Sequence, residues 1–434
     1  MPFKISKGAI GLLLLGLLIG SGIGFAFSYT IIPPTPASPT PVAGLVGDVT
    51  VLALVPLSGT LTTYGENSKV AAELAVSDVN AWLAETGAKW RLKYIFEDTA
   101  TDPTTALSKL KTWHGRGVVI CHSMTSSSEL KECKGYADAN HILMISSMSS
   151  SAALAIPNDY IYRNIPHSLK SCKPIVALMK EAGIKHVIAT WRGDSWGDSF
   201  HDAAKSELAL AGIVCHDEYG IRYDPQLTTF TVQAAKLYDA VKALVDSGVP
   251  KNEIGIYAIA FDEIALYMAE AAKYPLLREV KWFGTDSSAN VDTLIKNTVA
   301  GRFAVDTKFI NPTYSPGENP KKERVRQYIM KVLGREPDPY AYSAYDVVWY
   351  IAIALRMANA YDADAVKNLL PSVVANYYGA SGWFTLDENG DRAFADYDLW
   401  ILREVNGTLK WTIAGRWSYM TGKTEWIIPI YQQA

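Results

Sequence analysis

Apolar segments of strand length alternate with helix-like segments along most of the chain, and this order constrains the fold more than any other feature. The series begins at residue 48, where an apolar strand is expected at residues 49–54 and an amphipathic helix at residues 67–85, with Gly87 as its stop. Continuous apolar strands separated by helices indicate a parallel sheet that is covered on both faces. The sequence therefore predicts an α/β fold with doubly wound sheets.

The alternation continues to about residue 306 and restarts once, after Arg163, so we expect two doubly wound units in tandem. Further strands are expected at residues 91–96, 117–121, 141–145, 186–191, 213–219, 253–259 and 280–283. Further helices are expected at residues 104–113, 128–139, 171–181, 198–210, 230–245 and 263–272. In the rest of the chain, helices are expected near residues 321–333 and 345–358, and strands near residues 397–403 and 409–414. These elements are too few for a third α/β domain, so we expect them to complete the two units.

The N-terminal segment predicts a membrane anchor. Residues 8–32 contain no charged side chain, and this segment is long enough to cross a bilayer. Lys4 and Lys7 precede the segment, so the N-terminus is expected in the cytoplasm and the body of the protein outside it. We expect residues 1–32 to form an uncleaved signal anchor and the proline-rich residues 33–47 to form a stalk. The alternative is a pilin-like leader cut after Lys7-Gly8, which resembles archaeal class III signal sequences.

Composition and motifs exclude several functions. The net charge of −3 gives no basic surface for nucleic acid. The seven histidines lack His-x-x-x-His spacing, and neither a Gly-x-Ser-x-Gly elbow nor a phosphate-binding loop is present, so no metal, cofactor or catalysis is expected. One alternative remains for catalysis: His122 lies near the serine-rich turn at Ser126 to Ser128, where a hydroxyl and an imidazole could form a pair. The four cysteines lack Cys-x-x-Cys spacing and allow either three disulfide connectivities or buried free thiols.

Two serine-rich turns mark the expected ligand site. Ser126-Ser127-Ser128 and residues 146–151 each follow a short apolar strand, and each is expected to open a helical stretch. Such a turn presents free backbone N–H groups and the positive end of the helix dipole, and hydroxyls added there form a cradle for a small anion such as a carboxylate. Two such cradles on adjacent strands, with no nucleophile–base pair nearby, indicate a protein that binds a ligand and does not transform it.

An ordered set of short motifs resembles the type I periplasmic binding proteins, and within them the leucine/isoleucine/valine-binding proteins of ABC importers. The set consists of Pro56-Leu57-Ser58-Gly59, Tyr64-Gly65, Asp98 with Asp102-Pro103, Ser126-Ser127-Ser128, residues 142–146, Arg163 and Trp196-Gly197. The resemblance covers about residues 48–417. It implies two lobes joined by three crossings, near Arg163, Val305 and Gly382. Lobe 1 would then comprise residues 48–162 and 307–381, and lobe 2 residues 163–306 and 382–434.

The resemblance also implies a set of ligand-binding residues. These are Tyr64, Ser127, Met148, Ser149, Ser150, Trp196, Phe261 and Asp286. Ser127, Ser150 and the backbone of Met148 would hold a carboxylate, Asp286 an ammonium group, and Trp196 and Phe261 would close over the ligand. Asp286 stands where a longer glutamate is usual, and it could instead cap the helix that follows it. Trp196 and Phe261 replace tyrosines, and Met148 replaces a small residue and narrows the pocket.

These observations predict an extracytoplasmic solute-binding protein of an ABC importer. The expected ligand is an amino acid or a related small zwitterion, which closure of the lobes would present to a membrane permease. Two alternatives remain: a receptor ectodomain that reports closure to another membrane protein, and a subunit of a pilin-like surface assembly.

Overall fold

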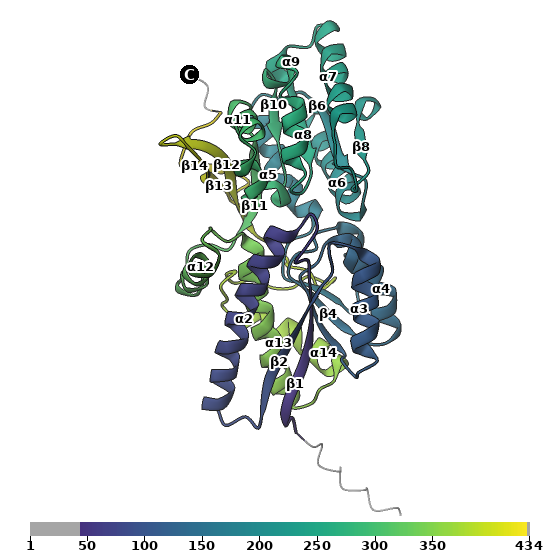
Figure 1. Ribbon diagram of the computed structural model, residues 1–434, viewed down its shortest axis with the longest axis vertical. Coiled ribbons are helices and arrows are strands. Elements are labelled where there is room, and N and C mark those ends of the chain that lie inside the picture. Colours follow the sequence, from purple (N-terminus) through teal and green to yellow (C-terminus); the bar gives the residue numbers. More distant parts are fainter. Residues whose placement is uncertain (1–43, 432–434) are drawn as a thin grey trace, which may run out of the picture. The chain divides into compact units, whose positions relative to one another are not determined.

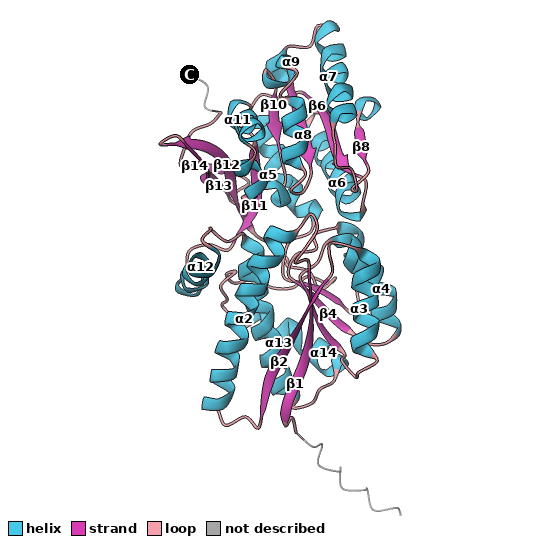
Figure 2. Cartoon of the chain, in the orientation of Figure 1, coloured by secondary structure: helices cyan, strands magenta, loops and turns pink. Residues whose placement is uncertain are grey.

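The computed structural model describes residues 44–431, which form helices and strands arranged around two separate β-sheets (Figures 1 and 2). The expected anchor at residues 1–32 and residues 33–43 of the expected stalk lie outside this range. Among the described residues, no helix combines the length and the hydropathy that crossing a membrane requires. The predicted anchor therefore stays a prediction.

The first sheet has five parallel strands in the order β2-β1-β3-β4-β5. They are β1 (Gly47–Val55), β2 (Trp90–Asp98), β3 (Ile120–Ser123), β4 (Leu143–Ser146) and β5 (Ile161–Arg163). Successive residues of β1 face opposite cores, as the two-residue period of a strand requires. Val51 and Ala53 pack in one hydrophobic cluster, and Leu52 and Leu54 in another.

Helices cover both faces of this first sheet. The cluster around Val51 includes residues of α2 (Thr62–Glu85), α13 (Pro339–Ala358) and α14 (Ala363–Ala375), with α12 (Pro320–Leu333) packed beside α2. The cluster around Leu52 includes residues of α3 (Pro103–His114) and α4 (Ser127–Ala139). This covering on both sides is why the strands read as continuous apolar runs.

The second sheet has nine strands in the order β14-β13-β12-β11-β10-β9-β6-β7, with β8 pairing to β6. They are β6 (His186–Arg192), β7 (Val214–Cys215), β8 (Ile221–Tyr223), β9 (Ile254–Ile259), β10 (Lys281–Phe283), β11 (Ile310–Ser315), β12 (Asp396–Val405), β13 (Thr408–Trp417) and β14 (Thr424–Trp426). Its helices are α5 (Ser168–Glu181), α6 (Ser195–Ala211), α7 (Thr231–Asp246), α8 (Ile264–Ala271), α9 (Pro275–Arg278), α10 (Asp292–Lys296) and α11 (Thr298–Asp306). Strands β6 to β11 are parallel, and β11 to β14 are antiparallel.

The chain passes between the two sheets at positions that differ in part from the expectation. β11 belongs to the second sheet, because Ile310 pairs with Phe283 on one side and with Ile401 on the other. The second passage therefore follows Ser315 and does not lie near Val305, and residues 310–315 are not part of lobe 1. The first passage follows Arg163, as expected, and the third lies between α14 and β12.

Other differences concern short or proline-containing elements. The strand expected at residues 213–219 is only β7, followed by the 3₁₀ helix η2 (Asp217–Tyr219) and then β8. β11 and α14 were not expected, and each contains a proline, Pro312 and Pro371 respectively. Proline lowers the apparent propensity of both segments, and tertiary packing overrides it.

Candidate ligand-binding cleft

The first serine turn begins helix α4 and leaves two amides available. Ser126 is the N-cap: its Oγ accepts from the amide of Glu129 at 3.3 Å, and its own amide donates to Glu129 Oε2 at 2.8 Å. This capping box engages the first and the last of four successive amides. The amides of Ser127 and Ser128 lie between them in the first helical turn, where the helix dipole favours an anion.

The second serine turn meets the first because β3 and β4 are parallel neighbours with Ser123 opposite Ser146. Ser127 Oγ accepts from Ser149 Oγ at 2.9 Å and from the amide of Ser151 at 3.1 Å. Ser146 Oγ accepts from the amides of Met148 and Ser149. The two turns therefore form one continuous hydroxyl and amide surface.

The second turn does not open an α-helix, so this part of the expectation is wrong. It leads into η1 (Ala152–Leu154), a single 3₁₀ turn. The amide of Met148, which was expected to hold a carboxylate, is directed to Ser146 Oγ at 3.3 Å. The second serine turn therefore adds no α-helix dipole to that of α4.

Two aromatic residues of the second lobe face the serine turns. The rings of Trp196 and Phe261 lie 4.5 Å apart, and Trp196 Nε1 donates to Ser150 Oγ at 3.1 Å. The Arg192 guanidinium stacks on Phe261 at 4.0 Å and is itself held by Asp194 and Glu263. The aromatic pair is thus supported by a buried ion network.

A glycine follows each of the two aromatic residues that begin a cleft helix. Gly65 follows Tyr64, and a Cβ on Gly65 would lie 1.9 Å from the carbonyl oxygen of Pro56. Gly197 follows Trp196, and its Cβ would lie 2.1 Å from the carbonyl oxygen of Arg192. Both glycines let the first helical turn pack directly on the end of the preceding strand, which directs the aromatic side chain into the cleft.

Asp286 lies at the base of the second lobe among buried tyrosines. Burial raises the pKa of its carboxyl to about 6, and the hydroxyls of Tyr340 and Ser287 oppose that rise in part. Its neighbour Ser287 lines the cavity, and Asp286 does not. Tyr64 crosses between the lobes here, donating from its hydroxyl to the carbonyl of Ala289 at 2.8 Å.

The cavity between the lobes has eight lining residues. They are Leu61, Tyr64, Ser126, Ser127, Met148, Trp196, Phe261 and Ser287. Five of them were expected, and Ser149 and Ser150 adjoin it through their hydrogen bonds to Ser127 and Trp196. Leu61, Ser126 and Ser287 were missed, although each is a near neighbour in sequence of an expected residue.

The cavity is nearly closed in this structure. Its volume is about 10 Å³, which is the space of one water molecule. Hydrogen bonds hold the lobes together around it: Trp196 to Ser150, the amide of Ser195 to Ser128 Oγ, and Thr63 Oγ1 to Asp262. An amino acid fits only after these contacts open.

A larger hollow adjoins this cavity at its rim. It has a volume of about 810 Å³ and lies between Gly59-Thr60 of the first lobe and residues of α8, α10 and α11. Thr60 and Asp262 line the hollow, and they directly adjoin Leu61 and Phe261 of the cavity.

His122 pairs with a serine of the second serine turn and not with one of the first, as its place in the sequence had suggested. His122 Nε2 lies 3.1 Å from Ser147 Oγ and not beside Ser126 to Ser128. Both residues are fully buried, and burial lowers the pKa of His122 to about 3, so its imidazole is neutral. Neither residue lines the cavity, so this pair has the surroundings of a core hydrogen bond.

A comparison with known families identifies the family of this chain. A family model described as the receptor family ligand binding region matches residues 67–404. The chain belongs to this family. It is of the type I periplasmic binding protein kind, as the sequence motifs predicted. The uncharacterized protein MJ1266 of Methanocaldococcus jannaschii is 29% identical over 392 residues, covering 86% of this chain and 90% of that protein.

Solved structures show the same fold at low sequence identity. The leucine-binding protein LivK of Thermotoga maritima superposes with a TM-score of 0.70 at 17% identity, covering 84% of this chain and 97% of LivK. The protein LivJ of Streptococcus pneumoniae, in complex with isoleucine, superposes with a TM-score of 0.67 at 16% identity, covering 84% of this chain and 99% of LivJ. A solute-binding protein of R. palustris in complex with benzoate superposes with a TM-score of 0.67 at 15% identity, covering 85% of this chain and 96% of that protein. The fold of this chain is therefore that of ABC-transporter solute-binding proteins.

Proposed function

We propose that this protein is an extracytoplasmic solute-binding protein of an ABC importer and that its ligand is a small carboxylate, with amino acids as the first candidates. The observation that supports it most is the junction of the two serine turns, where Ser127 Oγ accepts from Ser149 and Ser151 directly opposite Trp196. Leucine, isoleucine and benzoate, named for three similar proteins or their complexes, share a carboxylate group.

Binding begins in the open state with the carboxylate on the first lobe. It takes the free amides of Ser127 and Ser128 and displaces Ser149 and Ser151 from Ser127 Oγ. Each charge-assisted hydrogen bond in this dry site stabilises the complex by about 1.5–3 kcal/mol. The second lobe then closes, and Trp196 and Phe261 cover the rest of the ligand.

The opposite end of the cavity decides between ligand classes. Asp286 stands beside the lining residue Ser287, and its ionised carboxylate attracts an ammonium group. Met148, Trp196 and Phe261 form apolar walls that suit an aliphatic or aromatic body. The proposal thus places an α-amino acid with an apolar side chain ahead of an aromatic acid. None of these roles involves bond making or breaking, so we propose no enzymatic activity.

Calorimetry on the full chain tests this proposal. Leucine, isoleucine, the other common amino acids, benzoate and 4-hydroxybenzoate are titrated separately, and at least one is expected to bind with a Kd below about 1 mM. The double variant Ser127→Ala with Ser150→Ala is expected to weaken that binding at least tenfold. It is also expected to lower the melting temperature of the unliganded protein, because it leaves buried donors unpaired, so a thermal melt establishes that the variant is folded at the temperature of the titration.

The matched control is Ser171→Ala, which removes a buried hydroxyl that does not line the cavity and contacts Tyr397. It is expected to bind as the wild type does. Absence of binding for every compound, or equal binding by the double variant, contradicts the proposal.

The family description supports a second function, a ligand-sensing receptor ectodomain. Both functions use the same cleft closure but differ in the membrane partner. Deleting the gene in the source organism is expected to abolish uptake of the bound ligand if the protein serves a permease. Unchanged uptake with a lost cellular response to the ligand supports the receptor. The membrane anchor predicted at residues 1–32 suits either function, since it keeps the body near its partner.

A further inference from the structure

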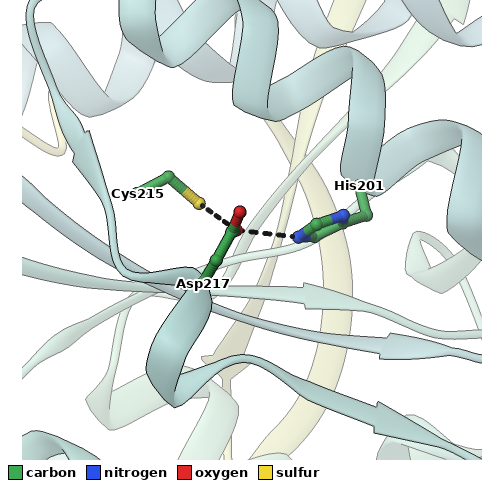
Figure 3. A group of neighbouring side chains, drawn as sticks. All are labelled: His201, Cys215 and Asp217. Carbon is green, nitrogen blue, oxygen red and sulfur yellow. Dashed lines mark hydrogen bonds and ion pairs between the residues drawn. The ribbon is translucent and has the colours of Figure 1, made fainter.

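A cluster of three different potential metal ligands lies in the second lobe, away from the cleft. His201 comes from α6, Cys215 from the end of β7 and Asp217 from η2, and their side chains point toward one another (Figure 3). One ligand atom of each lies within 4.8 Å of the other two. None of these residues lines the cavity between the lobes.

Two of the three distances between ligand atoms match the edges of a tetrahedral site, and the third, between His201 and Cys215, is under 4.8 Å. His201 Nε2 lies 3.3 Å from Asp217 Oδ1, and Cys215 Sγ lies 3.5 Å from the same oxygen. Zinc bonds of ordinary length at a tetrahedral angle place nitrogen about 3.4 Å and sulfur about 3.6 Å from such an oxygen. One ion can therefore contact all three atoms with little movement of the side chains.

The environment of His201 prepares its Nε2 as a ligand. The side chain is 9% exposed, and Nε2 has no hydrogen-bond partner although Asp217 is close. The Trp191 ring stacks on the imidazole at 3.9 Å and holds its plane. Nδ1 lies 3.3 Å from Asp202 Oδ1, the carboxylate contact that orients metal-bound histidines in proteins.

The neighbouring charged groups leave the three ligand atoms available. Lys205 contacts Asp217 through Oδ2, whereas Oδ1 accepts from the Cys215 thiol, whose proton is lost when zinc binds. His216 is engaged elsewhere: one ring nitrogen lies 3.0 Å from His186 and the other 2.8 Å from Glu218. In a second cluster, formed by His167, Asp387 and Asp391, both oxygens of each carboxylate already have partners. Arg163 contacts both oxygens of Asp391, and Lys170 and backbone amides contact those of Asp387.

We propose that His201, Cys215 and Asp217 form a zinc-binding site with a fourth position open to water. A thiolate, an imidazole and a carboxylate are the donors that Zn²⁺ takes in proteins, whereas Mg²⁺ and Ca²⁺ prefer oxygen alone. Binding forms a bond from zinc to each ligand, and the Cys215 thiol releases its proton to solvent. The ion ties α6, which carries Trp196 at its start, to the edge of the second sheet.

The test is titration of the full, metal-free chain with Zn²⁺, and with Co²⁺ as a spectroscopic probe. One equivalent of Zn²⁺ is expected to bind with proton release, and Co²⁺ is expected to give a thiolate charge-transfer band. Cys215→Ser is expected to remove that band and to raise the Kd for zinc at least tenfold. His201→Gln and Asp217→Asn are expected to raise it by a similar factor.

Three control variants keep the assignment falsifiable. Cys133→Ser and His114→Gln change a cysteine and a histidine of the first lobe, and His216→Gln changes the nearest histidine outside the proposed set. All three are expected to bind zinc as the wild type does, and thermal melts without metal establish that each variant is folded. Zinc bound at well under one equivalent, or with unchanged affinity in folded Cys215→Ser, overturns the site. Neither readout requires a ligand in the cleft.

Discussion

At the scale of the residue, the surroundings of Asp286 set its charge. Its neighbours include Tyr340, Tyr257 and Cys172, and burial raises the pKa of each of these groups above its usual range, so all three stay neutral near pH 6. Asp286, with a pKa of about 6, is therefore the group of this cluster that changes charge there. A buried aspartate of this kind can respond to an ammonium ligand through its own ionisation.

Binding of an amino acid is expected to weaken as the pH falls through 6. Ammonium attracts the ionised form of Asp286, and at pH 5 only about a tenth of this carboxyl is ionised when its pKa is about 6. The Kd measured by calorimetry should therefore rise about tenfold between pH 7 and pH 5. Asp286→Asn is expected to bind weakly with no such dependence, and benzoate is expected to bind the wild type no better at pH 7 than at pH 5. A flat profile for amino acids in the wild type removes Asp286 from the site.

The same pKa has an opposite consequence for the unliganded protein. The folded state holds the proton of Asp286 more tightly than the unfolded chain does, since the ordinary value is 3.8. The contribution of this group to stability is therefore full below about pH 4 and decreases as the pH rises to about 6. An ammonium ligand offsets this loss, so ligand-induced stabilisation should be greatest at neutral pH.

At the scale of the element, α4 connects stability to ligand binding through its N-cap. Ser126 satisfies the amide of Glu129, and Ser126 and Ser127 of the same turn line the cavity. The remote helix α3 has an equivalent cap, in which Asp102 accepts from the amide of Thr105 at 2.7 Å.

Ser126→Ala is expected to lower the free energy of unfolding by about 1 kcal/mol, the ordinary cost of losing an N-cap. Asp102→Ala is expected to have a similar effect, because it removes an equivalent hydrogen bond. Only Ser126→Ala should also weaken carboxylate binding, by at least threefold, since it alone loosens the turn that holds the anion. Urea unfolding and calorimetry measure the two effects. Equal ligand affinity in both variants contradicts a role for this turn.

At the scale of the whole molecule, a buried ion pair joins two of the chain passages between the lobes. Arg163 ends β5, and its Nε donates to Asp391 Oδ1 at 2.6 Å, with a second contact to Oδ2. Both side chains are fully buried, and the backbones of the two residues also form a parallel bridge. Arg163 further donates to the carbonyl of Ser151, so the passage and the second serine turn are held together.

Asp391→Ala is expected to lower the free energy of unfolding by about 3–5 kcal/mol, because it leaves the Arg163 charge buried without a partner. The control is Glu404→Ala, which breaks an exposed ion pair with Arg302 and is expected to change the free energy of unfolding by less than about 1 kcal/mol. Urea unfolding of both variants provides the comparison. A loss below about 1 kcal/mol for Asp391→Ala would show that Arg163 finds other partners, such as water.

Sequence reasoning was most successful where burial follows local periodicity. Strands β1 to β4 and helices α3 and α4 lie within about three residues of their predicted places, and the serine turns follow β3 and β4 as predicted. These features depend on a few neighbouring residues, which the chain displays directly.

What the sequence by itself determined is therefore the alternation of strands and helices, the two lobes and the turns that meet at the cleft. Only the tertiary structure decided that β11 pairs with β10 and β12, that Ser287 and not Asp286 lines the nearly closed cavity, and that His201, Cys215 and Asp217 converge. The physical reason is the range of the interactions. Periodic burial acts between neighbours in the chain, whereas strand pairing and side-chain clusters join segments whose separation no local pattern encodes.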